Sequence, residues 1–411
     1  MQVRRVVISG MGSISPFGRG VEILVESLFA MKSAVVNVPA LNDLLGLRPR
    51  VAALVPHIDP KEIPRKYRRS MSPMSVFATL ACQEALGQGN PPAEYFTSGR
   101  MGIVIGSTIG SPIVTEGFFR DYLANHGTEG MRAVTFFQLM NHSCASNVAQ
   151  ALRINGRILA PSSACSTSCQ AIGYGFEMIA FGKQDMMLCG GADEFHPLSP
   201  AIFDIMSAAS IAYNDVPHRT PRPFDLSRDG VVCSEGSGIV LLESLESAKR
   251  RGAPVLAEIV GFATRCDTSN IADPNSDSME ACMREALKDA GMSAARIDYV
   301  NAHATGTIQG DIAEAQALNR VFGDNVPVSS LKGHLGHTMA ACGALETIGS
   351  IAMINKGAIV PTLNLETIDP ACANIRHVRE VEQLPVGAFV KNNFALGGVN
   401  TSIVIRRYEH D

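Results

Sequence analysis

Short runs of apolar residues recur along the chain, and glycine or other small residues close each run. Runs this short that carry no polar alternation are typical of strands that are buried on both faces. We therefore expect buried strands whose ends open into Gly-rich loops. The runs lie at 6–12, 101–110, 185–194, 238–243, 297–306 and 387–398.

Helical patterns lie between these runs. The clearest are at 75–89, 278–291 and 311–323, and each ends at or beside glycine, as helix C-termini often do. Alternation of strands and helices predicts an α/β protein with mostly parallel sheets.

Two long stretches of the chain follow the same plan. Residues 157–182 and 326–357 each run from an apolar strand through a turn of small residues into a helix. This repetition predicts a duplicated unit. The charged segment ESLESAKRRGAPV contains Gly and Pro, and it places the boundary near residue 250. We therefore expect two halves, 1–250 and 251–411.

Composition narrows the function classes. Of the 411 residues, 46% are hydrophobic and only 18% are charged, an apolar excess that a subunit interface would account for. The net charge of -4 argues against nucleic-acid binding, which needs a basic field along one face. No apolar run approaches the length of a membrane span, and the apolar stretch after the N-terminal arginines is too short for a signal peptide. We expect no nucleic-acid or membrane partner.

The ten cysteines form no CxxC pair and have no regular spacing. That pattern is typical of reduced thiols, and it predicts a cytoplasmic location.

One cysteine stands out by its position. In SSACSTSCQAIG, Cys165 falls at the predicted turn between a strand ending with RILAPSSA and the following helix, where free N–H groups and the helix dipole favour a thiolate. The same N–H groups could hold the oxyanion of an acyl-transfer step. A small buried hydrophobe is the alternative interpretation, and it is the expected one for Cys169. Zinc needs about four ligands, and no second matched pair is present, so we expect no metal.

Two histidine motifs follow. His303 leaves an apolar strand into a loop of hydroxyls and glycines, where it could meet a substrate or serve as a core histidine. Lys332, His334 and His337 cluster before a small-residue helix that contains Glu346. The lysine and glutamate could orient the histidines, or the cluster could be a surface turn. Farther on, the glycines of FALGG predict a loop whose backbone closely approaches another group.

Taken in order, these motifs resemble those of the β-ketoacyl-acyl carrier protein synthases, the elongating condensing enzymes of fatty acid and type II polyketide synthesis. The resemblance runs from residue 3 to about 405 and implies a thiolase-like five-layered α/β/α/β/α fold with two pseudo-duplicated halves. It also implies a 3-oxoacyl-[acyl-carrier-protein] synthase, an acyltransferase that extends an acyl chain by two carbons. The motifs are SSACSTS (162–168), RPFDLSRDGVVCSEGSGIVLLE (222–243), AHATGTIQGD (302–311), SLKGHLGHTMAACGALE (330–346) and NNFALGGVN (392–400).

The resemblance also implies roles for individual residues. Cys165 would accept the acyl chain as a thioester. His303 and His337 would promote decarboxylation of malonyl carrier protein, and Glu346 would hold the active-site Lys332.

Other implied roles concern binding. The backbone N–H groups of Cys165 and Leu396 would form the oxyanion hole, and Thr305 and Thr307 would hold the phosphopantetheine arm. No cofactor is expected beyond that arm, which belongs to the acyl carrier protein, the expected partner. The relatives' docking site for their acidic carrier corresponds here to a basic segment that could otherwise be a solvated helix. It contains Lys61, Arg65, Lys66, Arg68 and Arg69.

The sequence departs from the family pattern at several positions. ALGG replaces the usual GFGG, so that Leu396 stands where the family has a gating aromatic residue. DGVV, HATGT, Ala340 and Cys342 are further departures. We therefore expect a reshaped acyl pocket, lined in part by Ile109, Phe203 and Leu396, for a chain other than the ordinary saturated one.

Several alternatives stay open at this point. The nearest is a specialised type II polyketide or polyene (aryl polyene-like) ketosynthase that works as a heterodimer with a non-identical partner, rather than as the expected homodimer. A silent chain-length factor would lack the nucleophilic cysteine. A thiolase would carry that cysteine much earlier in the chain, and the lysine and histidine pair disfavour a cysteine hydrolase.

Overall fold

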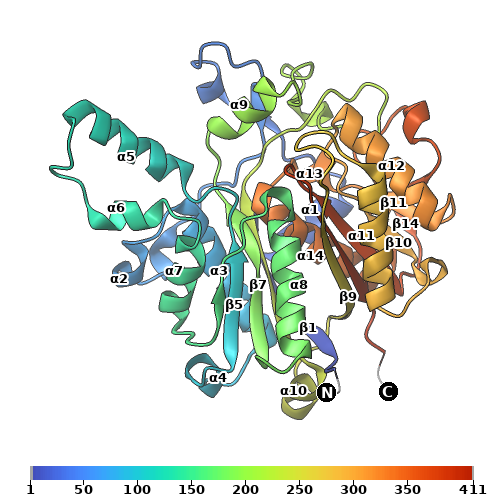
Figure 1. Cartoon of the computed structure of the whole chain (residues 1–411), viewed down its shortest axis with the longest axis horizontal. Coiled ribbons are helices and arrows are strands. Elements are labelled where there is room, and N and C mark those ends of the chain that lie inside the picture. The colour runs from blue at the N-terminus through green and yellow to red at the C-terminus, as the bar shows by residue number, and fades with distance from the viewer. Residues whose placement is uncertain (1–2, 410–411) are drawn as a thin grey trace.

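A twelve-stranded mixed sheet runs through the molecule (Figure 1). The computed structural model describes residues 3–409. The first half of the chain supplies β1 (Val6–Ser15), β2 (Gly18–Arg19), β5 (Met101–Gly106), β6 (Ile158–Leu159), β7 (Met186–Asp193) and β8 (Gly236–Ser244). The second half supplies β9 (Ala257–Cys266), β10 (Tyr299–Asn301), β11 (Pro327–Ser329), β13 (Arg376–His377), β15 (Ala388–Phe394) and β16 (Val399–Arg406). Two small sheets pair β3 (Val36–Asn37) with β4 (Val51–Ala52) and β12 (Ala358–Ile359) with β14 (Glu382–Gln383).

Strand order reveals the duplication. The order β6-β5-β7-β8-β1 in the first half corresponds to β11-β10-β15-β16-β9 in the second, and the two halves meet where β1 pairs antiparallel with β9. In each half the first three strands are parallel and the last two pairs are antiparallel. The prediction of mostly parallel sheets is therefore wrong. Strands buried on both faces are apolar throughout in either direction, so the hydrophobic pattern does not reveal the direction.

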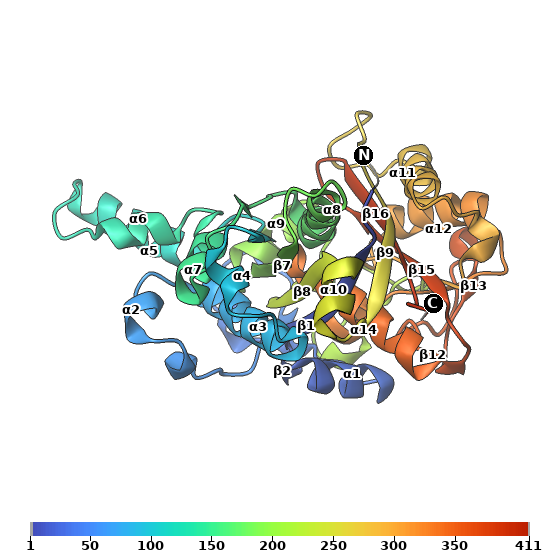
Figure 2. The ribbon, with the colours of Figure 1, turned by 90° about the horizontal axis from the view of Figure 1, so that it is seen from below.

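Helices separate and cover the two halves. Between them lie α8 (Thr167–Ala180) and α14 (Cys342–Lys356), which contact each other and strands of both halves. The outer faces are covered by α3 (Pro73–Gly89) on β1 and β8, and by α11 (Ser276–Asp289) on β9 and β16, with α12 (Ile308–Phe322) against α11 (Figure 2). This order gives the predicted five layers, α/β/α/β/α.

The two central helices approach each other closely. A Cβ on Gly343 of α14 would lie only 2.7 Å from the backbone nitrogen of Cys169 on α8. Cys169 is fully buried there, as predicted for a packing residue. The small residues at this contact let the two helices approach closely, so that their N-terminal ends lie next to each other.

Two of the remaining helices stand apart from the body. The pair α5 (Pro112–Asn125) and α6 (Ala133–Gln138) projects from one side as an arm (Figures 1 and 2). Within residues 3–409, no helix is long and apolar enough to cross a membrane. The other helices are α1 (Val21–Phe29), α2 (Arg65–Arg68), α4 (Glu94–Thr97), α7 (Ser143–Leu152), α9 (Leu198–Ile205), α10 (Leu245–Arg251) and α13 (Lys332–Leu335).

The six apolar runs and three helical patterns all correspond to elements of the structure, namely β1, β5, β7, β8, β10 and β15 with α3, α11 and α12. The strand expected over RILAPSSA is shorter, because only Ile158–Leu159 pairs with β5. Pro161 follows and has no N–H to donate to a ladder. The Pro161 carbonyl oxygen packs against the end of β5, because a Cβ on Gly106 would lie only 2.0 Å from it.

Candidate active site

A cavity of about 410 Å³ opens beside Cys165, and both halves of the chain contribute to its wall. Cys165 comes from the turn before α8, His303 from the loop after β10, and His337 from the loop after α13. The structure therefore brings together three side chains that are far apart in the sequence.

Cys165 occupies a constrained turn. It lies in a short 3-10 helix, Ala164–Ser166, directly before α8, and only 6% of the residue is exposed. Ala164 has a φ of 47°, in the left-handed region that non-glycine residues rarely adopt. The Ser166 hydroxyl contacts the carbonyl oxygens of Asn393 and Val399 at 3.0 and 2.7 Å, which fastens the turn to β15 and β16. Strain of this kind persists where the surrounding structure enforces it.

Burial dominates the electrostatics of Cys165. Desolvation raises the pKa of the thiol to about 11, although the charge of Lys332 and the backbone N–H groups of Leu396 and Cys165 act to lower it. The two N–H groups thus act on the sulfur in the expected direction, but burial outweighs them. Burial therefore favours the thiol form of Cys165 in the resting protein, against the effect predicted for the turn.

His337 contacts the cysteine directly. Its Nε2 lies 2.9 Å from Cys165 Sγ, and its Nδ1 accepts a hydrogen bond from the N–H of Met339 at 3.2 Å. A ring nitrogen that accepts carries no proton in the neutral imidazole, so the proton of His337 is on Nε2. Burial, followed by the charges of Lys332 and Lys391, holds the pKa of His337 well below its usual value. His337 is therefore neutral, with an N–H directed at the sulfur.

His303 lies beside it, with its ring centroid 5.4 Å from that of His337. Burial, followed by the charges of Lys332, His337 and Lys391, lowers the pKa of His303 well below its usual value. The backbone N–H groups of His303 and Ala304 donate to Glu314 on α12 at 2.8 and 2.6 Å. Two neutral imidazoles thus face the same cavity.

Two buried lysines share one carboxylate behind the histidines. Lys332 Nζ lies 2.6 Å from one oxygen of Glu346, and Lys391 Nζ lies 2.7 Å from the other. All three side chains are almost completely buried, and together they carry one net positive charge. Sequence reasoning found Lys332 and Glu346 but missed Lys391, whose signal was a lysine inside the apolar run GAFVKNNF.

The pair Thr305 and Thr307 lines the cavity, with the two hydroxyl oxygens 3.1 Å apart. Arg228, which is buried, donates to the carbonyl oxygens of Thr307 and Ile308 at 3.4 and 3.0 Å. Asp311 accepts the N–H of Gly306 at 3.1 Å. The threonine loop is therefore held from both sides.

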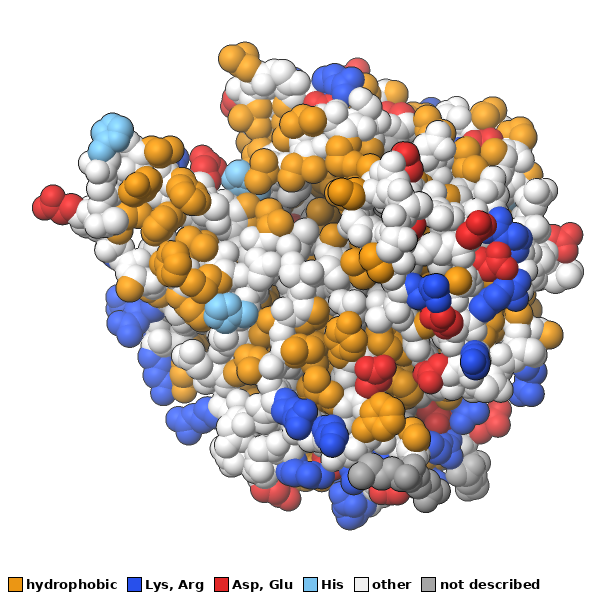
Figure 3. Space-filling model, in the orientation of Figure 1, with side chains coloured by type: hydrophobic (Ala, Val, Ile, Leu, Met, Phe, Trp, Pro, Cys, Tyr) orange, Lys and Arg blue, Asp and Glu red, His pale blue; other side chains and the backbone are white. Residues whose placement is uncertain are grey.

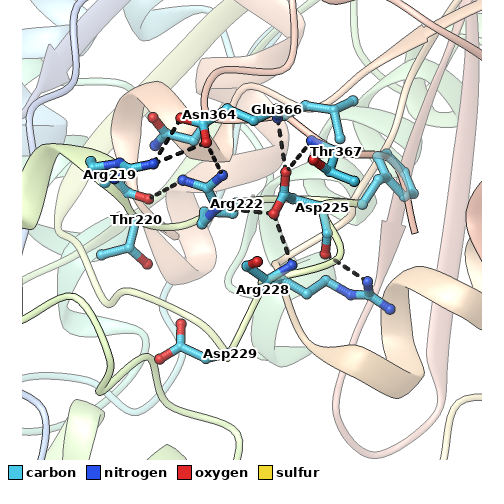
Figure 4. A network of polar contacts seen from close by, with 12 residues as sticks. Arg219, Thr220, Arg222, Asp225, Arg228, Asp229, Asn364, Glu366 and Thr367 are labelled. Carbon is cyan, nitrogen blue, oxygen red and sulfur yellow. Dashed lines mark hydrogen bonds and ion pairs between the residues drawn. The ribbon is translucent and has the colours of Figure 1, made fainter.

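The RPFDLSRDG motif supplies the arginine that holds this loop. Figure 4 shows the polar network around the motif. Arg222 and Asp225 form a buried ion pair at 3.1 Å, and Asp225 also accepts the N–H groups of Glu366 and Thr367 at 2.8 Å each. Arg228 pairs with Asp369 at 2.7 Å. The network fixes the motif to the segment 364–369 of the second half, so its role is to hold one wall of the site.

Leu396 also lines the cavity and is partly exposed. The close backbone approach expected of the adjacent glycines occurs at Gly398, where a Cβ would lie 2.3 Å from the carbonyl oxygen of Asp267. The group that the glycines approach is thus the loop that starts at Asp267. The backbone N–H of Leu396 faces Cys165.

Other predicted residues fall elsewhere. Phe203 on α9 lines the cavity, but Ile109 does not: it is 44% exposed, because the turn after β5 carries it outward. The place of Ile109 in the acyl pocket therefore stays a prediction. His334 points away and contacts the carbonyl oxygens of Lys32 and Pro361. The basic residues Lys61, Arg65, Lys66 and Arg69 are exposed, Arg68 is half-buried, and none of the five lines the cavity.

Cys165, His303 and His337 are residue types that can bind a metal ion. The ligand atoms of Cys165, His303 and His337 lie within 4.8 Å of one another, a spacing that three ligands of one ion could share. The buried net positive charge of the two lysines and Glu346 would repel a cation at this point. The donors fit proton and hydrogen-bond chemistry better.

Comparison with known proteins identifies the family. The family models described as "Beta-ketoacyl synthase, N-terminal domain" and "Beta-ketoacyl synthase, C-terminal domain" match residues 3–248 and 256–366. The chain is 34% identical to "3-oxoacyl-[acyl-carrier-protein] synthase 1" of Haemophilus influenzae, over 99% of this chain and 100% of the relative. It is 35% identical to the protein of that name from Escherichia coli K12, over 98% of this chain and 99% of the relative.

Solved structures agree. A β-ketoacyl synthase from Burkholderia phymatum STM815 matches with a TM-score of 0.95 at 42% identity, over 99% of this chain and 100% of that one. A type II PKS ketosynthase, solved with its acyl-carrier protein and bound to the hexaketide, matches with a TM-score of 0.88 at 29% identity, over 99% and 100%. The chain therefore belongs to the β-ketoacyl synthase family of acyltransferases and has their thiolase-like fold.

Proposed function

We propose that this chain is an elongating 3-oxoacyl-[acyl-carrier-protein] synthase that accepts an acyl chain on Cys165 and condenses it with malonyl carrier protein. The observation that carries the proposal is the contact of 2.9 Å between His337 Nε2 and Cys165 Sγ, with neutral His303 beside it. A nucleophile and two N–H donors thus share one cavity, and a buried positive charge lies behind the histidines.

The first half-reaction needs a nucleophile and an oxyanion site. Cys165 Sγ forms a bond to the carbonyl carbon of the acyl thioester, the bond to the carrier sulfur breaks, and the thiol proton ends on that sulfur. The N–H groups of Cys165 and Leu396 stabilise the tetrahedral oxyanion. The acyl chain then occupies the cavity beside Phe203 and Leu396.

The second half-reaction needs donors for an enolate. The Nε2–H groups of His303 and His337 donate to the thioester carbonyl oxygen of malonyl carrier protein. The bond to the carboxylate breaks, CO₂ leaves, and the electron pair forms the enolate. Its carbon attacks the thioester carbonyl carbon on Cys165, the bond to the cysteine sulfur breaks, and the released thiolate takes up a proton from water. The positive charge of the lysine pair stabilises the negative charge that develops.

The substrates arrive on a carrier protein. Thr305 and Thr307 line the cavity and bind the phosphopantetheine arm through their hydroxyls. The exposed basic residues Lys61, Arg65, Lys66 and Arg69 attract an acidic carrier, an interaction that weakens with added salt.

A homodimer completes the assembly. The edge strand β6 carries exposed Ile158 and Leu159 and offers an unpaired edge to a second copy. Apolar side chains also gather on the projecting arm at the left of Figure 3, among them Phe119, Leu123 and Phe136. Pairing through these surfaces buries the apolar excess. Sedimentation of the purified chain as a monomer at micromolar concentration would exclude it.

The function is tested by reconstitution. Purified protein is incubated with malonyl carrier protein and with a carrier protein that holds a saturated acyl chain. We expect a 3-oxoacyl product that is two carbons longer, with one CO₂ released per product. Cys165→Ser should lose the product. Hydrolysis of the acyl thioester on the carrier protein, with no extension of the acyl chain, would contradict the proposal.

A further inference from the structure

Residues on one face of β15 reach the reaction centre. Lys391 and Asn393 alternate with Asn392 along this strand, so the first two side chains share one face and the third points to the other. Lys391 reaches Glu346, whereas the Asn392 amide contacts Met283 Sδ and Ser402 Oγ on the opposite side. Asn393 is therefore directed at the site.

The Asn393 amide nitrogen contacts both the turn that carries Cys165 and the ring of His303. It lies 3.1 Å from the carbonyl oxygen of Cys165 and 3.3 Å from His303 Nδ1, and also 3.1 Å from Cys342 Sγ. The carbonyl oxygen can only accept, so the nitrogen and not the oxygen of the amide must face this point. In the described chain the Asn393 oxygen has no hydrogen-bond partner.

This orientation fixes the proton on His303. The amide N–H group donates toward Nδ1, so Nδ1 must carry the lone pair. In a neutral imidazole the proton is then on Nε2, the nitrogen that remains available to a ligand in the cavity. The hydrogen bond also limits rotation of the ring.

The two histidines thus reach the same tautomer by different means. For His337 the donor to Nδ1 is the backbone N–H of Met339, which a side-chain substitution does not remove. For His303 the donor is the side chain of Asn393. Only the second arrangement can be altered by mutation at the donor.

We propose that Asn393 is a positioning residue that holds His303 as the Nε2–H tautomer, and so aims a donor at the thioester oxygen of malonyl carrier protein. This inference rests on the proposed function for its catalytic consequence. Asn393 touches no substrate in this account, since it acts through His303.

Two substitutions of Asn393 distinguish a role in positioning His303 from a purely structural role. In Asn393→Asp the carboxylate accepts a proton from Nδ1–H and so favours the other tautomer. Asn393→Ala removes the donor without replacing it. Asn392→Ala is the matched control, because that residue is equally buried on the same strand but faces away.

The first measurement is the tautomer itself. Nitrogen-15 spectra of histidine-labelled protein distinguish a ring N–H from a bare ring nitrogen, and the His303 signals are those missing in His303→Gln. The wild-type protein and Asn392→Ala should show Nε2–H. Asn393→Asp should show Nδ1–H at His303 and leave His337 unchanged.

The second measurement compares the two half-reactions. Transfer of an acyl chain to Cys165 should persist in Asn393→Asp and fall much less than CO₂ release, because the hydrogen bond to the Cys165 carbonyl oxygen is also lost. Persisting acylation also shows that the variant is folded. Release of CO₂ from malonyl carrier protein should fall by about a hundredfold, the usual effect of losing a positioned proton donor.

The outcomes are distinct. A His303 that keeps Nε2–H in Asn393→Asp, or acylation and CO₂ release that fall by the same factor, would overturn the role of Asn393. A wild-type protein that acylates but releases no CO₂ would refute the proposed function, and the spectra alone would then decide the tautomer question.

Discussion

His337 Nε2 lies 2.9 Å from Cys165 Sγ, although the two residues are 172 positions apart in the chain. The contact forms only because the turn before α8 and the loop before α14 meet between the two halves. The nucleophile and its partner thus depend on docking of the duplicated units.

The raised pKa of Cys165 predicts its reactivity. Because burial raises that pKa to about 11, the thiolate fraction should increase about tenfold per pH unit from pH 7 to 9. The rate of iodoacetamide modification, followed by peptide mass mapping, should rise in parallel without a plateau. Buried Cys169 serves as the unlabelled control. A plateau below pH 8 would show a thiolate already formed at neutral pH.

Removal of the second lysine should move the pH profile. The positive charge of Lys391 lowers the pKa of both catalytic histidines, so Lys391→Met should raise these pKa values. Since the neutral imidazoles are the active form, the acid limb of kcat/KM should shift to higher pH, by about one unit.

The matched control for that shift is Lys356→Met at the exposed end of α14, which should leave the profile in place. An acid limb that stays fixed in Lys391→Met, with the protein folded, would mean that the lysine does not act on the histidines.

The threonine pair should affect binding more than chemistry. Replacing Thr305 and Thr307 together by valine removes two hydroxyls from the cavity wall. Each hydrogen bond contributes about 1 kcal/mol, so the loss of two should raise KM for malonyl carrier protein by about thirtyfold while kcat changes little. Steady-state kinetics test this, and a fall in kcat at constant KM would contradict it.

Leu396 should influence which acyl chain is accepted. Its side chain lines the cavity beside Cys165, and phenylalanine is larger and more rigid. Leu396→Phe should therefore reduce acylation by unsaturated or polyene carriers more than by saturated ones. Acylation rates over a panel of carriers give the comparison. A wild-type preference for saturated chains that Leu396→Phe leaves unchanged would refute a reshaped pocket.

Local patterns predicted much of this molecule, but long-range packing decided the rest. Apolar runs located the strands, and the motifs found Cys165, His303 and His337. The role of Asn393 depends on strand alternation and on contact with a turn 228 residues away, which no local pattern encodes. The burial that raises the pKa of Cys165 also arises from elements distant in sequence, so the local turn does not reveal it.

The most direct test of the account is the mass of the protein after incubation with acyl carrier protein alone. The wild-type chain and Cys169→Ala should each gain one acyl group, on the peptide that contains position 165, and Cys165→Ala should gain none. An acyl group retained by Cys165→Ala would contradict the central claim that Cys165 carries the chain.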